Sequence, residues 1–207
     1  MEGESRQAHW QNVYTSKGEN EVSWFQENPA VSLALIAETG ATHASAVIDI
    51  GGGASRLVDS LLSQEFGNVT VLDLSAAALA AAQARIGADA CKAKWIAADV
   101  TTWAPAQTYD VWHDRAAFHF LTTETEQAAY VQRLKQGLRD NGQVIIGTFA
   151  IDGPATCSGL PVARHSADSL ATILGNEFVL VGRRDHVHAT PWGAVQRFQF
   201  CVFRRRA

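Results

Sequence analysis

Residues 46–56 read AVIDIGGGASR, an apolar run that ends in three consecutive glycines. The β-branched run 46–50 predicts a buried strand, and apolar residues recur at the spacing of one helix face over 54–64. Strand, glycine turn and helix together form the first βα unit of an open sheet. Glycines at such a turn let the backbone approach a ligand where a side chain would collide.

The alternation of strand and helix continues along the chain, which is typical of a mostly parallel sheet. The predicted strands cover residues 46–50, 68–74, 93–99, 109–114, 143–149, 178–184 and 195–203. The predicted helices cover residues 5–15, 29–39, 54–64, 76–86, 124–139 and 166–174, and the Asn141-Gly142 pair suits a left-handed helix end. Because the last two strands have no helix between them, they must pair antiparallel or leave the sheet. We therefore expect an α/β fold: a Rossmann-like seven-stranded sheet, mostly parallel with one antiparallel strand, and helices on both faces.

Length and composition indicate one globular domain spanning residues 1–207, with residues 1–40 as a helical arm over the ligand edge of the sheet. Of the residues, 47% are hydrophobic and 18% are charged, which is far from a disordered composition. A net charge of -4 argues against a nucleic-acid binder. No apolar run reaches the roughly 18 residues of a membrane helix, and the polar N-terminus lacks a signal-peptide core. Three cysteines without paired spacing favour a cytoplasmic protein.

Three acidic residues stand at the ends of successive predicted strands: Asp49, Asp73 and Asp99. A carboxylate at Asp73 can accept hydrogen bonds from both ribose hydroxyls, and Asp99 can accept one from an adenine amine beside Val100. Asp49, two residues before the first glycine, suits a ligand that carries an ammonium and a sulfonium group. In a dinucleotide-binding turn the third glycine would stand where this chain has Arg56, so an NAD-binding oxidoreductase is the less favoured alternative.

Four motifs in this order, DIGGGAS (49–55), VLDLS (71–75), WIAADV (95–100) and YDVWHDRAAFHFL (109–121), resemble those of class I S-adenosylmethionine methyltransferases. The resemblance implies S-adenosylmethionine as the cofactor. It implies a cofactor site made of Trp10, Tyr14, Trp24, Asp49, Gly51, Gly52, Gly53, Asp73, Leu74, Ser75, Asp99, Val100, His113, Asp114 and Arg115. The three aromatic residues belong to the arm, where they could also be a helix packing stripe, and an aromatic face near a sulfonium would be favourable.

The segments at 111–121 and 149–162 partly resemble thiopurine S-methyltransferase and related thiol and chalcogen methyltransferases, with Ala116 in place of the family glycine. This resemblance implies a small soft nucleophile, a thiol or a selenium or metalloid compound, as methyl acceptor. A protein-lysine methyltransferase, whose arm is comparable, is an alternative that would make a protein the partner. A non-catalytic module that binds an adenosyl ligand is another.

For acceptor contacts or proton handling we predict His119, Asp114 and Arg164. A neutral histidine near the acceptor could act as a general base, because its pKa suits work near neutrality. His186 and His188 alternate on a strand, but no Cys or carboxylate is spaced to complete a zinc site with them, so no metal is expected. Of the cysteines, only Cys157 follows a strand end where it could face the acceptor.

Overall fold

The computed structural model describes residues 5–207 and contains a seven-stranded sheet with the strand order β3-β2-β1-β4-β5-β9-β8. Its strands are β1 (Ala46–Ile50), β2 (Asn68–Asp73), β3 (Ala93–Ala97), β4 (Tyr109–Arg115), β5 (Leu138–Phe149), β8 (Phe178–Ala189) and β9 (Val195–Arg205). A separate two-stranded hairpin pairs β6 (Thr156–Cys157) with β7 (Leu160–Pro161). The sequence did not predict this hairpin, because two-residue strands are too short to give a pattern.

Within residues 5–207, six α-helices and three short 3-10 helices accompany the sheet. The helices are α1 (Arg6–Ser16), α2 (Ala30–Glu38), α3 (Leu57–Ser63), α4 (Ala76–Ile86), α5 (Glu124–Gly137) and α6 (Ala167–Leu174), with η1 (Glu19–Glu21), η2 (Gly87–Lys92) and η3 (Phe118–Phe120). Side-chain caps begin several of them, as at Thr123, which accepts from the backbone N–H of Glu126. None of the helices in residues 5–207 is long and apolar enough to cross a membrane.

The predicted fold class is confirmed. Strands β1 to β5 are parallel, and β9 runs antiparallel to both of its neighbours, β5 and β8. The reversal follows from the chain itself, since the short β8–β9 connection leaves no room for the crossover that a parallel pair needs.

Several element boundaries differ from the sequence prediction, and two of these differences concern turns with special backbone conformations. The first helix after the glycines begins at Leu57 instead of residue 54, because the turn continues through Arg56. Strand β5 begins at Leu138 and therefore includes the Asn141-Gly142 pair, where the φ of Asn141 is 62°. The left-handed conformation was predicted correctly, but it lies inside the irregular start of the strand and not at the helix end.

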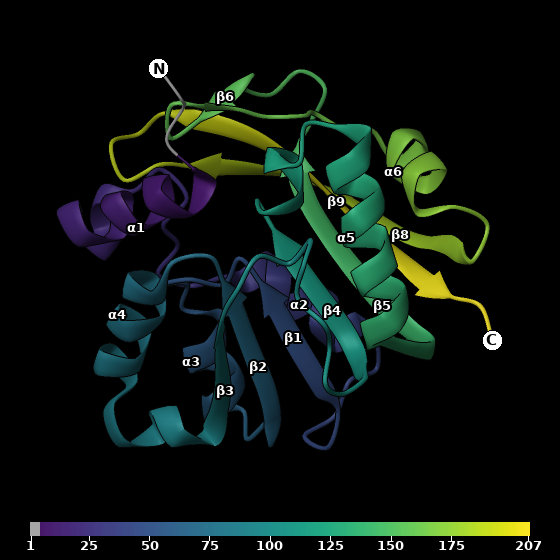
Figure 1. Ribbon diagram of the computed structural model, residues 1–207, viewed down its shortest axis with the longest axis horizontal. Helices are drawn as coiled ribbons and strands as arrows, with labels where there is room; N and C mark the ends of the chain where they lie inside the picture. Colours follow the sequence, from purple (N-terminus) through teal and green to yellow (C-terminus); the bar gives the residue numbers. More distant parts are fainter. Residues whose placement is uncertain (1–4) are drawn as a thin grey trace.

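Apolar side chains fill both faces of the sheet. Helices α5 and α6 cover one face, where Leu134 and Leu170 pack with the fully buried Trp112. Helices α2, α3 and α4 cover the other face, and their Ile36 and Leu61 belong to its core. Figure 1 shows this layering, with α1 and β6 lying beyond the end of the sheet where the parallel strands finish.

The N-terminal arm is tied to that end of the sheet by polar contacts. The side-chain oxygen of Gln11, on α1, accepts hydrogen bonds from Ser75 Oγ at 3.1 Å and from the backbone N–H of Ala77 at 3.2 Å. Helix α1 therefore lies against the start of α4, above the turn that follows β2 (Figure 1). This position makes the arm one wall of the cavity described next.

Candidate active site

The glycine turn after β1 has a shape that side chains would prevent. Gly51 has a φ of +66°, and a Cβ on it would lie 2.6 Å from the Cβ of Ala117. A Cβ on Gly52 would lie 2.6 Å from Asp49 Oδ2. The turn is therefore pressed between the end of β4 and the carboxylate below it, and its outer backbone is open to a ligand.

Asp73 ends β2 beside this turn, and it is buried. Its Oδ1 accepts a hydrogen bond of 2.8 Å from the backbone N–H of Ser75. The pKa of Asp73 is raised to about 7, mainly by burial and also by the nearby charge of Asp49, against hydrogen bonds from Ser75 and Gly53 that lower it. A carboxyl group held in this way can accept hydrogen bonds from a ribose once it is ionised.

Asp99 lies at the next strand end and is held by local hydrogen bonds. Its Oδ1 accepts from the backbone N–H of Thr101 at 2.8 Å and from the Thr101 hydroxyl at 2.7 Å. Arg6 of α1 lies 3.7 Å from Asp99 Oδ2 and 3.0 Å from Glu126. The arm thus closes over the part of the site where adenine was predicted.

Aromatic side chains of the arm form a cluster above the turn. The ring of Trp10 lies 4.9 Å from that of Phe120 and 5.5 Å from that of Trp24, both edge-to-face. The indole N–H of Trp24 donates to the hydroxyl of Tyr14 at 3.2 Å. These rings provide π faces beside a ligand, an arrangement that favours a cation such as a sulfonium.

These elements line a cavity at the carboxyl ends of the parallel strands. It is lined by Arg6, Trp10, Tyr14, Trp24, Ile50, Gly51, Leu72, Asp73, Leu74, Ala98, Asp99, Val100, Arg115, Ala116, Ala117, Phe120, Leu121 and Cys157. Nine of these residues belong to the predicted cofactor site: Trp10, Tyr14, Trp24, Gly51, Asp73, Leu74, Asp99, Val100 and Arg115. A mostly apolar wall with carboxylates at the ribose and adenine positions fits an adenosyl group.

Arg115 is the cationic side chain at the other end of the cavity from Asp99. Its Nη1 donates to the backbone oxygen of Trp24 at 2.9 Å, and its guanidinium lies 5.2 Å from the ring centre of Phe198. Its Nε and Nη2 are buried and have no hydrogen-bond partner within residues 5–207. Burial lowers the pKa of Arg115 to about 10, so the group keeps its charge at neutral pH and can bind an anion.

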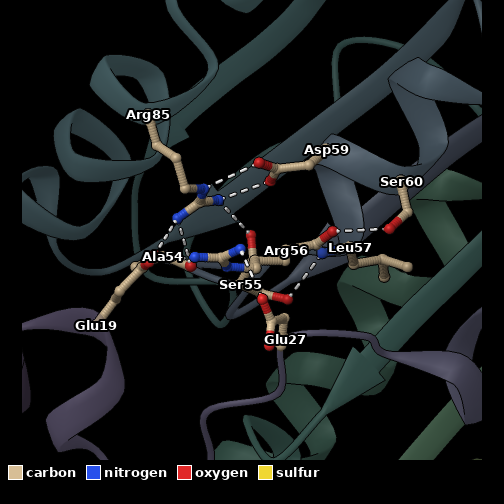
Figure 2. A network of polar contacts seen from close by, with 9 residues as sticks. All are labelled: Glu19, Glu27, Ala54, Ser55, Arg56, Leu57, Asp59, Ser60 and Arg85. Atoms are coloured by element: carbon tan, nitrogen blue, oxygen red, sulfur yellow. Dashed lines mark hydrogen bonds and ion pairs between the residues drawn. The ribbon is translucent and has the colours of Figure 1, made fainter.

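A second cavity adjoins the first and shares Tyr14, Trp24 and Arg115 with it. Two of its lining residues, Glu19 and Arg56, belong to an ion-pair network, which Figure 2 shows. Glu19 Oε2 lies 2.8 Å from Arg85 Nη1, and Glu19 Oε1 lies 2.5 Å from Arg56 Nη2. The network joins the arm to the glycine turn, since Arg85 also donates to the backbone oxygen of Ala54.

Several predicted cofactor residues lie next to the cavity without lining it. Gly52 and Gly53 belong to the turn after β1, and Asp49 lies beneath this turn with His113. Ser75 begins the helix after β2, since it caps α4 by accepting from the backbone N–H of Ala78.

The predicted acceptor residues Asp114, His119 and Arg164 also lie outside the cavity lining. Asp114 accepts hydrogen bonds from the backbone N–H groups of Ala117 and Phe118 and from the Tyr130 hydroxyl. Asp114 thus fixes the backbone conformation of the residues that follow β4. The exposed side chain of Arg164 donates to the backbone oxygen of Gly153.

His119 is fully buried, and neither ring nitrogen has a partner within the described part of the chain. Burial, followed by the nearby His165 and Arg115, lowers its pKa to about 3. The imidazole is therefore neutral at physiological pH, and its ring packs 4.8 Å from that of Phe149.

Cys157 lines the cavity as predicted, while Cys91 lies near β3 and Cys201 on β9, which are far apart in the strand order. Burial raises the pKa of Cys157 to about 11, so its thiol is protonated at neutral pH. The three cysteines therefore do not form a common metalloid site. His188 Nε2 contacts the backbone oxygen of Ser23 at 2.7 Å, which gives this histidine a structural partner.

Among the residues that sequence reasoning missed, Arg6 and Phe120 stand out because both line the cavity. Phe120 directly follows the predicted His119, which does not line the cavity. Nothing in the sequence marks Arg6, whose place depends on how α1 docks.

Residues 47–142 match the model of a family described as a methyltransferase domain. Among solved structures, N-methyltransferase NodS from Bradyrhizobium japonicum WM9, in complex with S-adenosylhomocysteine, is similar over 98% of this chain and 100% of that one, with a TM-score of 0.75 and 18% identity. A structure reported for the conversion of a disulfide bond into a thioacetal group during echinomycin biosynthesis is similar over 95% of this chain and 91% of that one, with a TM-score of 0.71 and 21% identity.

The 1,6-didemethyltoxoflavin-N1-methyltransferase of Burkholderia thailandensis, with bound 1,6-didemethyltoxoflavin and S-adenosylhomocysteine, has a TM-score of 0.67 and 21% identity, over 96% of this chain and 83% of that one. The search of curated proteins finds no match. The fold is that of class I S-adenosylmethionine-dependent methyltransferases, and the matched domain supports this enzyme class and its cofactor, S-adenosylmethionine.

Proposed function

We propose that the protein transfers the methyl group of S-adenosylmethionine to a small soft nucleophile, with a thiol or selenol as the favoured acceptor. The observation that carries the proposal is the buried guanidinium of Arg115, whose Nε and Nη2 have no partner within residues 5–207. The adenosyl part of the cofactor would lie along Leu74, Asp73 and Val100, which leaves the end of the cavity at Arg115 for the acceptor.

The charged groups of the cavity favour an acceptor that ionises by itself. Of the two carboxylates in its lining, Asp73 would bind the ribose and Asp99 is paired with Arg6, and no histidine within residues 5–207 lines it. An alcohol would need a general base in this place. A thiol, with an ordinary pKa near 8.5, needs only a nearby cation to become a thiolate.

S-Adenosylmethionine supplies a methyl carbon that is activated by the adjoining sulfonium. The protein's residues align the partners and exclude water. Trp10 and Phe120, whose rings contact each other, line the cavity and would shield the transfer from water, and Arg115 would hold the anionic acceptor. A small amine is the second candidate, because three of the proteins with similar structures are N-methyltransferases, although that likeness concerns the fold alone.

Transfer of labelled methyl from S-adenosylmethionine tests the proposal, with thiophenol, phenol, aniline and a lysine-rich protein as matched acceptors. We expect transfer to thiophenol and none to phenol. Arg115→Gln should lower kcat/KM for the thiol about tenfold or more, the effect of losing a charge-assisted contact. Arg183→Gln, an exposed change on β8, should leave the rate unchanged. Transfer to the protein lysine without transfer to the thiol would overturn the acceptor assignment.

A further inference from the structure

Three buried polar side chains form a continuous chain beneath the glycine turn. His113 Nδ1 lies 2.7 Å from Asp49 Oδ1, and His113 Nε2 lies 2.8 Å from the hydroxyl of Ser32. The three residues are only 2–3% exposed and come from β4, β1 and α2 respectively. Hydrogen bonds thus connect the helical arm to the first strand through one imidazole ring.

Both oxygens of Asp49 are fixed by their surroundings. Oδ1 contacts His113, and Oδ2 lies under Gly52, where an added Cβ would approach it to 2.6 Å. The charge of Asp49 also raises the pKa of Asp73, after the larger effect of burial, so its field reaches the cavity that Asp73 lines. A carboxylate in this place attracts a cation on the other side of the turn.

A buried carboxylate needs hydrogen-bond partners to stay in one orientation. Within the described residues, His113 is the side chain that contacts the carboxylate of Asp49 directly by a hydrogen bond. Because His113 does not line the cavity, any effect on a ligand must pass through Asp49.

We propose that His113 is a positioning residue of the cofactor site, which holds Asp49 so that its negative charge lies under the glycine turn and attracts the ammonium group of the cofactor. Ser32 fixes the imidazole from the opposite side and so links α2 to the turn. The inference rests on the proposed function, because it requires an S-adenosyl ligand in the cavity.

Two variants of His113 separate its two contacts. The side-chain nitrogen of Asn lies close to the position of Nδ1, so His113→Asn keeps a donor for Asp49 and loses Ser32. The nitrogen of Gln lies close to the position of Nε2, so His113→Gln keeps Ser32 and loses Asp49. Each variant loses one buried hydrogen bond, and thermal unfolding should show similar losses of stability.

Calorimetric titration with two ligands then tests the position of the charge. S-Adenosylhomocysteine carries the ammonium group, whereas 5′-methylthioadenosine has the same adenosine without it. We expect His113→Gln to weaken S-adenosylhomocysteine binding about tenfold, because losing a charge contact of this kind raises the dissociation constant by roughly a factor of ten. The affinity of His113→Asn should stay within about threefold of the wild type. Affinity for 5′-methylthioadenosine should change less than about threefold in both variants.

Equal losses for the two ligands, or equal losses in the two variants, would mean that His113 only stabilises the fold, and the proposal would be wrong. If both variants are unfolded, Asp49→Asn replaces them, because it keeps an acceptor for His113 and removes the charge. It should then weaken S-adenosylhomocysteine binding selectively, and an unchanged affinity would overturn the proposal. Failure of the wild type to bind S-adenosylhomocysteine would instead reject the proposed function.

Discussion

The carboxylate of Glu19 lies 2.8 Å from the guanidinium of Arg85, although the two residues are 66 positions apart in the chain. Glu19 belongs to η1 in the arm, and Arg85 lies near the end of α4. Glu19 also lines the second cavity, and Figure 2 shows its contact with Arg85. The nearby Arg56 and Arg85 lower the pKa of Glu19, against the effect of its burial, so the network stays charged over the neutral range.

Glu19→Gln should loosen the arm without unfolding the sheet. The variant keeps the size of the side chain and removes the charge that joins Arg56 to Arg85. We expect S-adenosylhomocysteine to dissociate about three to ten times faster, since partly exposed ion pairs contribute about 1 kcal/mol. Stopped-flow displacement measures the rate. Glu27→Gln is the matched control, because Glu27 is exposed and lies 4.0 Å from Arg56. Equal rates in both variants would contradict the role of Glu19.

Binding of the cofactor should depend on the ionisation of Asp73. Its pKa is raised to about 7 by burial, so below pH 7 the carboxyl is increasingly protonated and a ribose hydroxyl loses an acceptor. The affinity for S-adenosylhomocysteine should fall about tenfold per pH unit as pH decreases below 7, as expected for one linked proton. Calorimetry between pH 5.5 and 8 measures this slope. Asp73→Asn should bind weakly with no such slope, whereas Asp89→Asn, on the exposed η2 surface, should behave like the wild type. A flat profile for the wild type would refute the prediction.

Gly52→Ala should damage both stability and ligand binding. The new methyl group would lie 2.6 Å from Asp49 Oδ2 and 2.7 Å from Val71, so the turn must move. We expect a loss of about 1–3 kcal/mol in the free energy of unfolding, typical of overpacking at a buried site, and weaker binding of S-adenosylhomocysteine. Urea unfolding and calorimetry measure the two effects. Gly182→Ala provides the control, since a Cβ there would be 3.6 Å from Val202. A folded variant with unchanged affinity would show that the turn tolerates a side chain.

His119 should make the fold sensitive to acid. Its pKa is about 3 in the folded protein because of burial, whereas an unfolded histidine titrates near 6.5. Between these values the unfolded state binds more protons, so the contribution of His119 to stability is present above pH 6.5 and is lost as pH falls, by up to about 1.4 kcal/mol per unit. The contribution of Asp73 to stability changes in the opposite direction. Because its pKa is raised to about 7 in the folded protein, this contribution increases as pH falls from about 7 to 4. The test is therefore the difference between His119→Phe and the wild type.

The free energy of unfolding of His119→Phe should increase relative to that of the wild type as pH falls from 6.5 to 4. Urea unfolding at several pH values measures it, with His43→Phe, an exposed change, as the control. If the difference does not vary with pH, His119 is protonated in the folded state or titrates as it does in the unfolded chain.

The sequence by itself determined the sheet and the order of its motifs. Short apolar, β-branched runs such as 46–50 and 143–149 predicted strands. The absence of a helix between the last two strands required them to pair antiparallel or leave the sheet, and β9 is antiparallel to both neighbours. It also predicted that Asp73 and Asp99 lie at one edge of the sheet, because the carboxyl ends of parallel strands meet there, and both residues line the same cavity. These are local properties of the chain, combined with general rules of connection.

Only the tertiary structure decided which side chains face the ligand. The side chains of Asp49 and His113 lie beneath the glycine turn, and that of Asp114 points toward the backbone that follows it. Of the three consecutive residues His113, Asp114 and Arg115, Arg115 alone lines the cavity. Successive residues of a strand point to opposite faces, and the covering of each face is fixed by helices far away in the chain. The docking of α1 likewise brings Arg6 to Asp99 across 93 positions of sequence. Such contacts depend on the packing of whole elements, which no local pattern of residues specifies.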